Sequence, residues 1–213
     1  MDYLSDQKEL FERWKATEKH SGRHFIQDGI IDPEKWIAAR IKVLFLLKEA
    51  YGSITDLTEF IRKDAVLNKR TWMRCACWAH AAQSEHPLAF EDIQSNDAVK
   101  RDALLSCAVV NIKKSDGRRE SDMSDILSYA KQDSALLQEQ INLIAPTLII
   151  SGGVFDCWEE IWKAKPEKKA RRVWLVGNNI PAINFPHPAN HNLDDFLYWS
   201  ILKVLSDARP LIH

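Results

Sequence analysis

The sequence predicts an α/β fold with a mostly parallel sheet and helices on both of its faces. Continuous apolar runs such as Val43-Leu44-Phe45-Leu46-Leu47 are typical of strands buried on both sides of a parallel sheet. These runs alternate with segments of helical length, which is the pattern of repeated βαβ units. The chain has 213 residues, of which 46% are hydrophobic and 28% charged. This size and composition predict one compact domain over residues 1–213.

The first 40 residues read as an extension that packs on this domain. Leu4 to Lys19 has the apolar spacing of an amphipathic helix. Phe25 to Ile31 contains two apolar pairs around Asp28-Gly29, a turn signal that predicts a hairpin-like segment. Asp32-Pro33 then gives the N-cap and the first position of a short helix.

The strands and helices of the main body follow in alternation. Helical stretches are expected over about 54–64 and 68–84, after Gly153, and from about Asn192 to the C-terminal region. The expected strands are Lys42–Leu47, Leu104–Ile112, Thr147–Ile150, Val173–Val176 and Ala182–Phe185.

Four polar loops follow the strands, and they predict the position of the functional site. In an open parallel sheet, ligands bind at the carboxyl ends of the strands. The loops that meet there are Lys48–Gly52, Asn111–Arg119, Ser151–Gly153 and His187–Asn190. The basic run Lys163–Arg172 precedes a strand, so we expect it to form a solvated surface at the opposite edge.

The charge balance excludes binding of nucleic acid by bulk positive charge, as in histones. The chain has 29 basic and 30 acidic residues and a net charge of -1. No apolar run is long enough to cross a bilayer, and the first residues lack the pattern of a secretion signal. We therefore expect a cytoplasmic protein that does not bind membranes, and we expect a monomer.

The four cysteines are expected to be reduced, buried thiols. The alternative is a metal site, in which Cys77 and His80 on one helical face would be joined by Cys107 and Cys157. We predict no metal and no cofactor. The eight tryptophans are an unusually large number for this length, and we expect most of them to lie in the core.

The order of the loop motifs resembles the uracil-DNA glycosylase superfamily. The resemblance rests on the Glu49-Ala50-Tyr51-Gly52 turn, Asn111 with Lys114 and a following Gly117-Arg118, the Pro146–Gly153 strand, and His187-Pro188. It extends from about Lys42 to the C-terminal helix, and each motif alone is weak. It implies a three-layer α/β/α sandwich around a four-stranded, mostly parallel sheet.

The resemblance implies hydrolysis of the N-glycosidic bond of uracil or another damaged base flipped out of DNA. His187 would then donate to the base carbonyl, where negative charge develops. Asn111 would bind the base edge, and Tyr51 or a tryptophan of residues 72–78 would stack on the base. Glu49 would orient the attacking water or stabilise the cationic sugar.

The same resemblance implies DNA as the partner. Lys113, Lys114, Arg118 and Arg119 would contact phosphates without reading sequence, and Asn190 is a further candidate for this role.

Three positions depart from the family pattern. Ala189 stands where the last motif of the family has a serine, so a phosphate-contacting hydroxyl is missing. Lys48 stands where several branches have a glycine, and Tyr51 stands where they have a proline. Lys48 would enter the base pocket, and a buried lysine there is also a candidate amine nucleophile.

The alternative function is a catalytically inactive module of the same fold that binds a nucleobase, nucleotide or nucleic acid. Lys48 and the near-neutral charge favour the module, whereas Glu49, Asn111 and His187 together favour the enzyme. Simple structural roles are also open: His187 could cap the last helix, Asn111 could bond local backbone, and Glu49 could form a surface ion pair.

Overall fold

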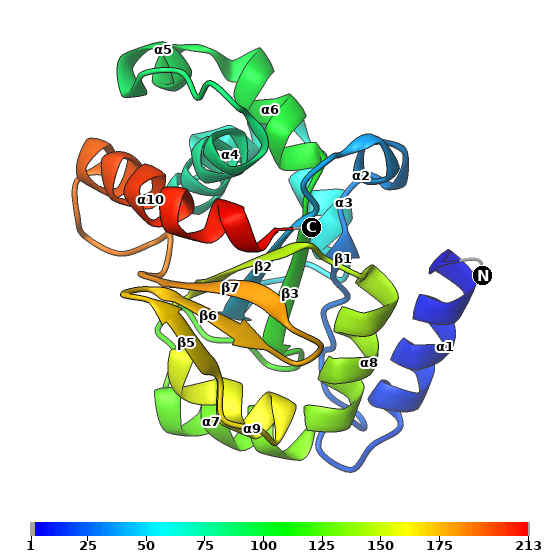
Figure 1. Cartoon of the computed structure of the whole chain (residues 1–213). Coiled ribbons are helices and arrows are strands. Elements are labelled where there is room, and N and C mark those ends of the chain that lie inside the picture. Colours follow the sequence, from blue (N-terminus) through cyan, green and yellow to red (C-terminus); the bar gives the residue numbers. More distant parts are fainter. Residues whose placement is uncertain (1–2, 213) are drawn as a thin grey trace.

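The computed structural model describes residues 3–212 and contains one mixed sheet of seven strands. The strands are β1 Gly29–Ile30, β2 Val43–Glu49, β3 Ala108–Lys113, β4 Leu148–Gly152, β5 Glu167–Ala170, β6 Val173–Val176 and β7 Ile180–Phe185. Their order across the sheet is β1-β3-β2-β4-β7-β6-β5 (Figure 1).

Four central strands, β3, β2, β4 and β7, pair in parallel. The edge strands β1, β6 and β5 pair antiparallel. The α/β class is therefore confirmed, but the expected sheet of four strands is too small. β1 is only two residues long, and β5 is an exposed Glu-Lys-Lys-Ala segment. Short or charged edge strands of this kind lack the apolar pattern by which a buried strand is recognised.

Helices cover both faces of the sheet (Figure 1). The α-helices are α1 Tyr3–Lys15, α2 Pro33–Ala38, α3 Leu57–Ile61, α4 Arg70–Gln83, α5 Phe90–Ser95, α6 Asp97–Leu105, α7 Met123–Gln132, α8 Ser134–Ile144, α9 Trp158–Trp162 and α10 Asp194–Ala208. Three short 3₁₀ helices are η1 Asp64–Asn68, η2 Phe155–Cys157 and η3 Arg209–Leu211.

Alternate side chains of the central strands supply two separate hydrophobic cores. In β2, Phe45 and Leu47 join a core with α3, α4, α6 and α10, whereas Leu44 and Leu46 join a core with α1, α7, α8 and α9. All four side chains are buried. Successive residues of a strand point to opposite faces, so a continuous apolar run serves both cores at once.

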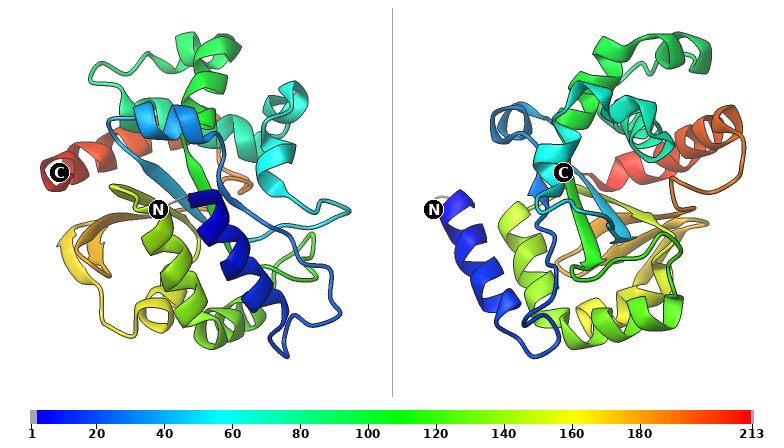
Figure 2. Two further views of the ribbon diagram at one scale, coloured as in Figure 1. Left: turned by 90° about the vertical axis from the view of Figure 1, so that its right-hand side faces the viewer. Right: turned by 180° about the vertical axis from the view of Figure 1, so that it is seen from behind.

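The N-terminal extension does not form the expected hairpin. Helix α1 packs beside α8, as Figures 1 and 2 both show. Residues 25–31 run along the edge of the sheet, where β1 pairs with β3 and Phe25 bridges to Ser115. Asp28 is not in an exposed turn but fully buried beside Lys114. This long-range ion pair replaces the local turn that Asp28-Gly29 predicted.

The remaining elements lie close to where the sequence predicts them. Helix α6 continues to Leu105, so the strand predicted from Leu104 begins at Ala108. Residues 163–172 lie at the surface, as expected, with β5 at the sheet edge.

Five of the eight tryptophans are buried, including Trp14, Trp78 and Trp158. Among the described residues, no helix is both long enough and apolar enough to span a membrane.

Candidate active site

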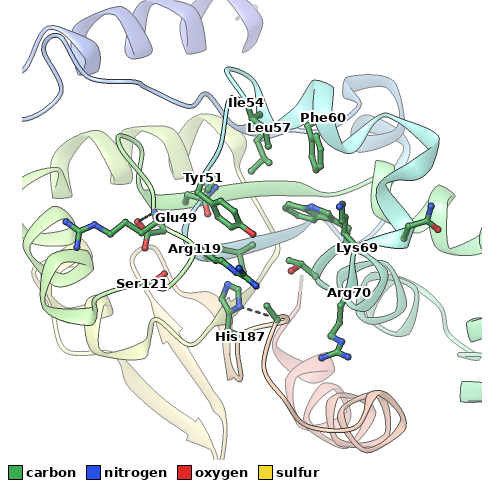
Figure 3. Close-up of a pocket in the computed structure, with 18 residues that line it drawn as sticks. Glu49, Tyr51, Ile54, Leu57, Phe60, Lys69, Arg70, Arg119, Ser121 and His187 are labelled. Carbon is green, nitrogen blue, oxygen red and sulfur yellow. Dashed lines mark hydrogen bonds between the residues drawn. The ribbon is translucent and has the colours of Figure 1, made fainter.

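A cleft of about 550 Å³ lies at the carboxyl ends of the parallel strands. Its lining comes from the ends of β2 and β3, the loop after β7, and the region of α3, η1 and the first turn of α4. Figure 3 shows Glu49 and Ser121 on one side of the cleft and Lys69 and Arg70 on the other. The position is the one that strand polarity predicts for a parallel sheet.

Glu49 is the last residue of β2 and lines the cleft. Its side chain is 2% exposed, and its Oε2 atom lies 3.2 Å from Lys113 Nζ. The same oxygen accepts a hydrogen bond of 3.0 Å from the backbone N–H of Arg118. Oε1 has no hydrogen-bond partner among residues 3–212. One carboxylate oxygen is therefore held by the protein, and the other is available to a water molecule.

Asn111 lies in β3 and also lines the cleft, although only 3% of its surface is exposed. Its backbone N–H donates to Asp28 Oδ2 over 2.8 Å, and its side-chain Nδ2 donates to the same oxygen over 3.4 Å. Within the described part of the chain, the amide oxygen of Asn111 has no partner. Asp28 thus orients the amide so that an acceptor remains free, and Asn111 does more than bond local backbone.

His187 follows β7 and lines the cleft from the third side. Its Nδ1 atom accepts a hydrogen bond of 3.1 Å from the backbone N–H of Ala189. Burial, and secondarily the positive charge of Lys48, lowers the pKa of His187 to about 4. The ring is therefore neutral at neutral pH, and its single proton is on Nε2. That nitrogen is a hydrogen-bond donor in a partly buried site.

Lys48 does not line the cleft. It alternates with Glu49 along β2, and its Cε atom would lie 3.5 Å from a Cβ atom placed on Gly153. Lys48 therefore acts on the site through its charge near His187. The structure therefore places Lys48 beside the cleft and not in its lining, on the opposite side of β2 from Glu49, and its expected contact with the base stays a prediction.

Aromatic side chains contribute to the apolar part of the cleft, together with aliphatic residues such as Leu47 and Ile54. Tyr51 lines it and is 53% exposed, whereas Trp72 lines it and is buried. Phe60 contributes from the end of α3. Trp78, the other tryptophan of the same helix, packs edge-on against Phe185 in the core. The structure thus brings Tyr51 and Trp72, two of the residues expected to stack on a base, to the cleft.

The expected phosphate contacts of Lys113 and Lys114 are wrong, because both ammonium groups are buried and paired. Lys113 Nζ lies 2.7 Å from Asp125 and 3.2 Å from Glu49. Burial alone would lower its pKa, but the hydrogen bonds to Asp125 and Glu49 outweigh that effect and raise it. Lys114 Nζ lies 2.5 Å from Asp28, and both side chains are fully buried.

Arg118 and Arg119 do reach the cleft and are exposed. Gly117 explains how their loop approaches β2, since a Cβ atom at this position would lie 1.6 Å from the carbonyl oxygen of Ala50. This close packing places the Arg118 N–H against Glu49. Glycine is required here for space, not for an unusual backbone angle.

Asn190 faces its own loop. Its Oδ1 atom accepts from the Asn192 backbone N–H over 2.8 Å, and its Nδ2 atom is buried without a partner among the described residues. It does not line the cleft. This arrangement offers no side-chain donor to a phosphate there.

Several site residues were not predicted from the sequence. Lys69, Arg70 and Thr71 line the cleft from the start of α4. Arg74, one turn later, is buried and donates to the carbonyl oxygens of Pro188, Asn190 and Asn192 over 2.6–2.9 Å and to Asp194 over 2.5 Å. A single arginine among Trp, Cys and Ala in a helix was the available signal, because a buried guanidinium requires acceptors.

The cysteines are free thiols, and all four are buried. Burial raises the pKa of Cys77 to about 11 and that of Cys157 to about 12, so neither is an activated nucleophile. Among residues 3–212, no group of three or more His, Cys, Asp or Glu side chains is arranged to hold a metal ion.

No protein-family model matches the chain, and no curated protein matches it. The function is therefore inferred from the geometry of the cleft.

Proposed function

We propose that the cleft binds a nucleobase extruded from DNA and that the protein hydrolyses its N-glycosidic bond. One observation carries the proposal: Glu49, Asn111 and His187, from the ends of three different strands, line one cleft, and each has a polar atom free for a ligand. An acceptor on Asn111 and a donor on His187 complement the N–H and C=O groups on the edge of uracil or hypoxanthine.

The leaving base is the group that His187 would stabilise. Departure of the base places negative charge on its carbonyl oxygen, and a neutral donor fixed in a partly buried site stabilises that charge without reorganisation. The hydrogen bond from Ala189 to Nδ1 fixes which ring nitrogen donates. Trp72 and Tyr51 would contact the faces of the base.

The attacking water would be held by Glu49. Its free Oε1 atom can accept a hydrogen bond from water while Lys113 and Arg118 hold Oε2 in place. A fixed carboxylate next to the sugar also favours the positive charge that develops there in the transition state.

A second function is favoured by the ion pair of the same carboxylate. Lys113 Nζ lies 3.2 Å from Glu49 and balances its charge, which weakens the attraction of Glu49 for a cationic sugar. An inactive module that binds a base or nucleotide needs Asn111, His187 and the aromatic residues, but it does not need the uncompensated charge of Glu49.

One assay separates the two functions. DNA strands that contain uracil, hypoxanthine or xanthine are incubated with the protein, and abasic sites are detected by alkaline strand cleavage. We expect cleavage of at least one of these substrates, with a decrease of roughly a hundredfold or more in Glu49→Gln and in His187→Ala. Absence of excision from all three, with base-dependent binding retained, would reject the enzyme and support the module.

A further inference from the structure

Unpaired cations lie on both long sides of the cleft. Lys69 and Arg70 lie at the start of α4, and Arg118 and Arg119 lie on the loop after β3. All four are exposed, and none forms an ion pair within residues 3–212. The only carboxylate among the described lining residues is Glu49, which Lys113 already neutralises. Figure 3 shows Lys69 and Arg70 opposite the side that holds Glu49, with Arg119 extending toward the middle of the cleft.

The backbone on each side is fixed, although the charged side chains are free. Trp72 and Met73 both donate to the carbonyl oxygen of Lys69 over 3.0 Å, which fixes the start of α4. The packing of Gly117 on Ala50 fixes the other side. Like charges held around one cleft repel one another, and the repulsion is relieved when an anion binds between them. The first turn of α4 contains no acidic residue that would compensate this charge.

We propose that these four residues form a phosphate clamp, so that the substrate is a DNA strand and not a free base or nucleoside. Lys69 and Arg70 would bind the backbone phosphate on one side of the extruded nucleotide, and Arg118 and Arg119 the phosphate on the other side. The inference rests on the proposed function, because the base between the two phosphates is the group that enters the cleft. It replaces the phosphate contacts expected of Lys113 and Lys114, which are buried.

The other basic segment of the chain provides a matched control. Residues 163–172 contain six basic side chains, but they lie along an edge strand away from the cleft. Lys168 and Arg171 are exposed and form no ion pair with other described residues. If positive charge alone bound DNA, this segment would contribute as much as the clamp.

The test uses a fluorescein-labelled DNA single strand with an uncleavable abasic-site analogue at its centre. Fluorescence anisotropy gives the Kd at several salt concentrations for the parent, for Lys69→Gln with Arg70→Gln, and for Arg118→Gln with Arg119→Gln. The control is Lys168→Gln with Arg171→Gln, which removes the same charge. We expect each clamp variant to bind roughly tenfold more weakly at low salt, with the slope of log K against log salt reduced by about 0.7 for each phosphate that the variant no longer neutralises. The control should bind like the parent.

Two results would overturn the clamp: clamp variants that bind like the parent, or a control variant whose affinity falls as much. Thermal unfolding verifies that the clamp variants are folded, which is expected because the substituted side chains are exposed and the Arg118 backbone bond to Glu49 is retained. Binding to the uncleavable strand does not require excision. If the parent protein binds through the clamp but excises no base, the enzymatic function alone is rejected. If the clamp variants excise the base with an unchanged KM, the clamp alone is rejected.

Discussion

His187 and Lys48 illustrate how one side chain sets the chemistry of another without touching the ligand. Burial is the larger cause of the lowered pKa of His187, and the Lys48 charge adds to it. A neutral imidazole is the form that can donate from Nε2 while Nδ1 accepts from Ala189. Lys48 does not line the cleft, but its charge supports the neutral form of His187, which does.

Replacement of Lys48 by Gln should raise the pKa of His187 from about 4 but leave it below the ordinary value of 6.5, because burial remains. The measurement is an NMR titration of the His187 ring. Lys163→Gln, which changes an exposed lysine at the C-terminal end of α9, is the control and should leave the titration unchanged. An unchanged pKa in Lys48→Gln would mean that burial alone sets the value.

Asp28 is the second residue whose role depends on long-range contacts. It accepts hydrogen bonds from Lys114, Asn111 and Gln140, and it is fully buried with Lys114. Burial lowers the pKa of Lys114, against the opposing effect of the Asp28 charge. Asp28 therefore both compensates a buried cation and orients the amide of Asn111.

Removal of the Asp28 charge should destabilise the protein by about 3–5 kcal/mol, because Asp28→Asn leaves a buried ammonium group without its counterion. Urea unfolding, followed by tryptophan fluorescence, measures this. The double variant Asp28→Asn with Lys114→Met removes both charges and should recover much of the stability. A cost below about 1 kcal/mol for the single variant would contradict a compensating role.

At the scale of elements, α4 links the cleft to the loop after β7. Its first turn lines the cleft, and Arg74 on the next turn holds residues 188–194 through five acceptor atoms. The guanidinium group has five donors in a planar fork, and lysine cannot reproduce this pattern. The position of His187 therefore depends on a contact between α4 and the loop.

Arg74→Lys should loosen that loop and lower excision by roughly 10–100-fold, since the donor ring of His187 is no longer held in place. Hydrogen exchange at the Ala189 and Asn190 amides reports the loosening directly. Arg209→Lys is the matched control: Arg209 also donates to carbonyl oxygens, those of Ala81 and Ser84, but near the other end of α4. Equal effects of the two variants would indicate a general decrease in stability instead.

At the scale of the whole molecule, stability should depend on pH through His187. Its pKa is lower in the folded protein, about 4, than the ordinary 6.5 of the unfolded chain. Between these values the unfolded chain binds the extra proton, so the free energy of unfolding falls as the pH decreases from 6.5 toward 4. The contribution is at most about 3 kcal/mol.

Urea unfolding at a series of pH values tests this, with His187→Asn as the reference because it has no titrating ring. The parent should lose more stability than the variant across that window, and the two should run in parallel above pH 7, where the ring is neutral in both states. Parallel curves throughout would show that His187 titrates normally in the folded protein.

The sequence alone determined the α/β class, the central strands that are buried on both faces, and the end of the sheet at which the polar loops meet. These follow from local patterns: continuous apolar runs predict buried strands, and strand polarity places Glu49, Asn111 and His187 at one end of the sheet. The sequence did not predict the edge strands β1 and β5, because they form by pairing with a neighbouring strand and have no apolar pattern of their own.

Only the tertiary structure decided which charged residues are free. Lys113, Lys114, Arg118 and Arg119 are close in sequence, but the first two are buried against Glu49, Asp125 and Asp28, while the arginines remain exposed. Lys69 and Arg70 join the arginines from a distant helix. The physical reason is that the availability of a charge depends on its burial and its partner, and both are supplied by segments far away in the sequence.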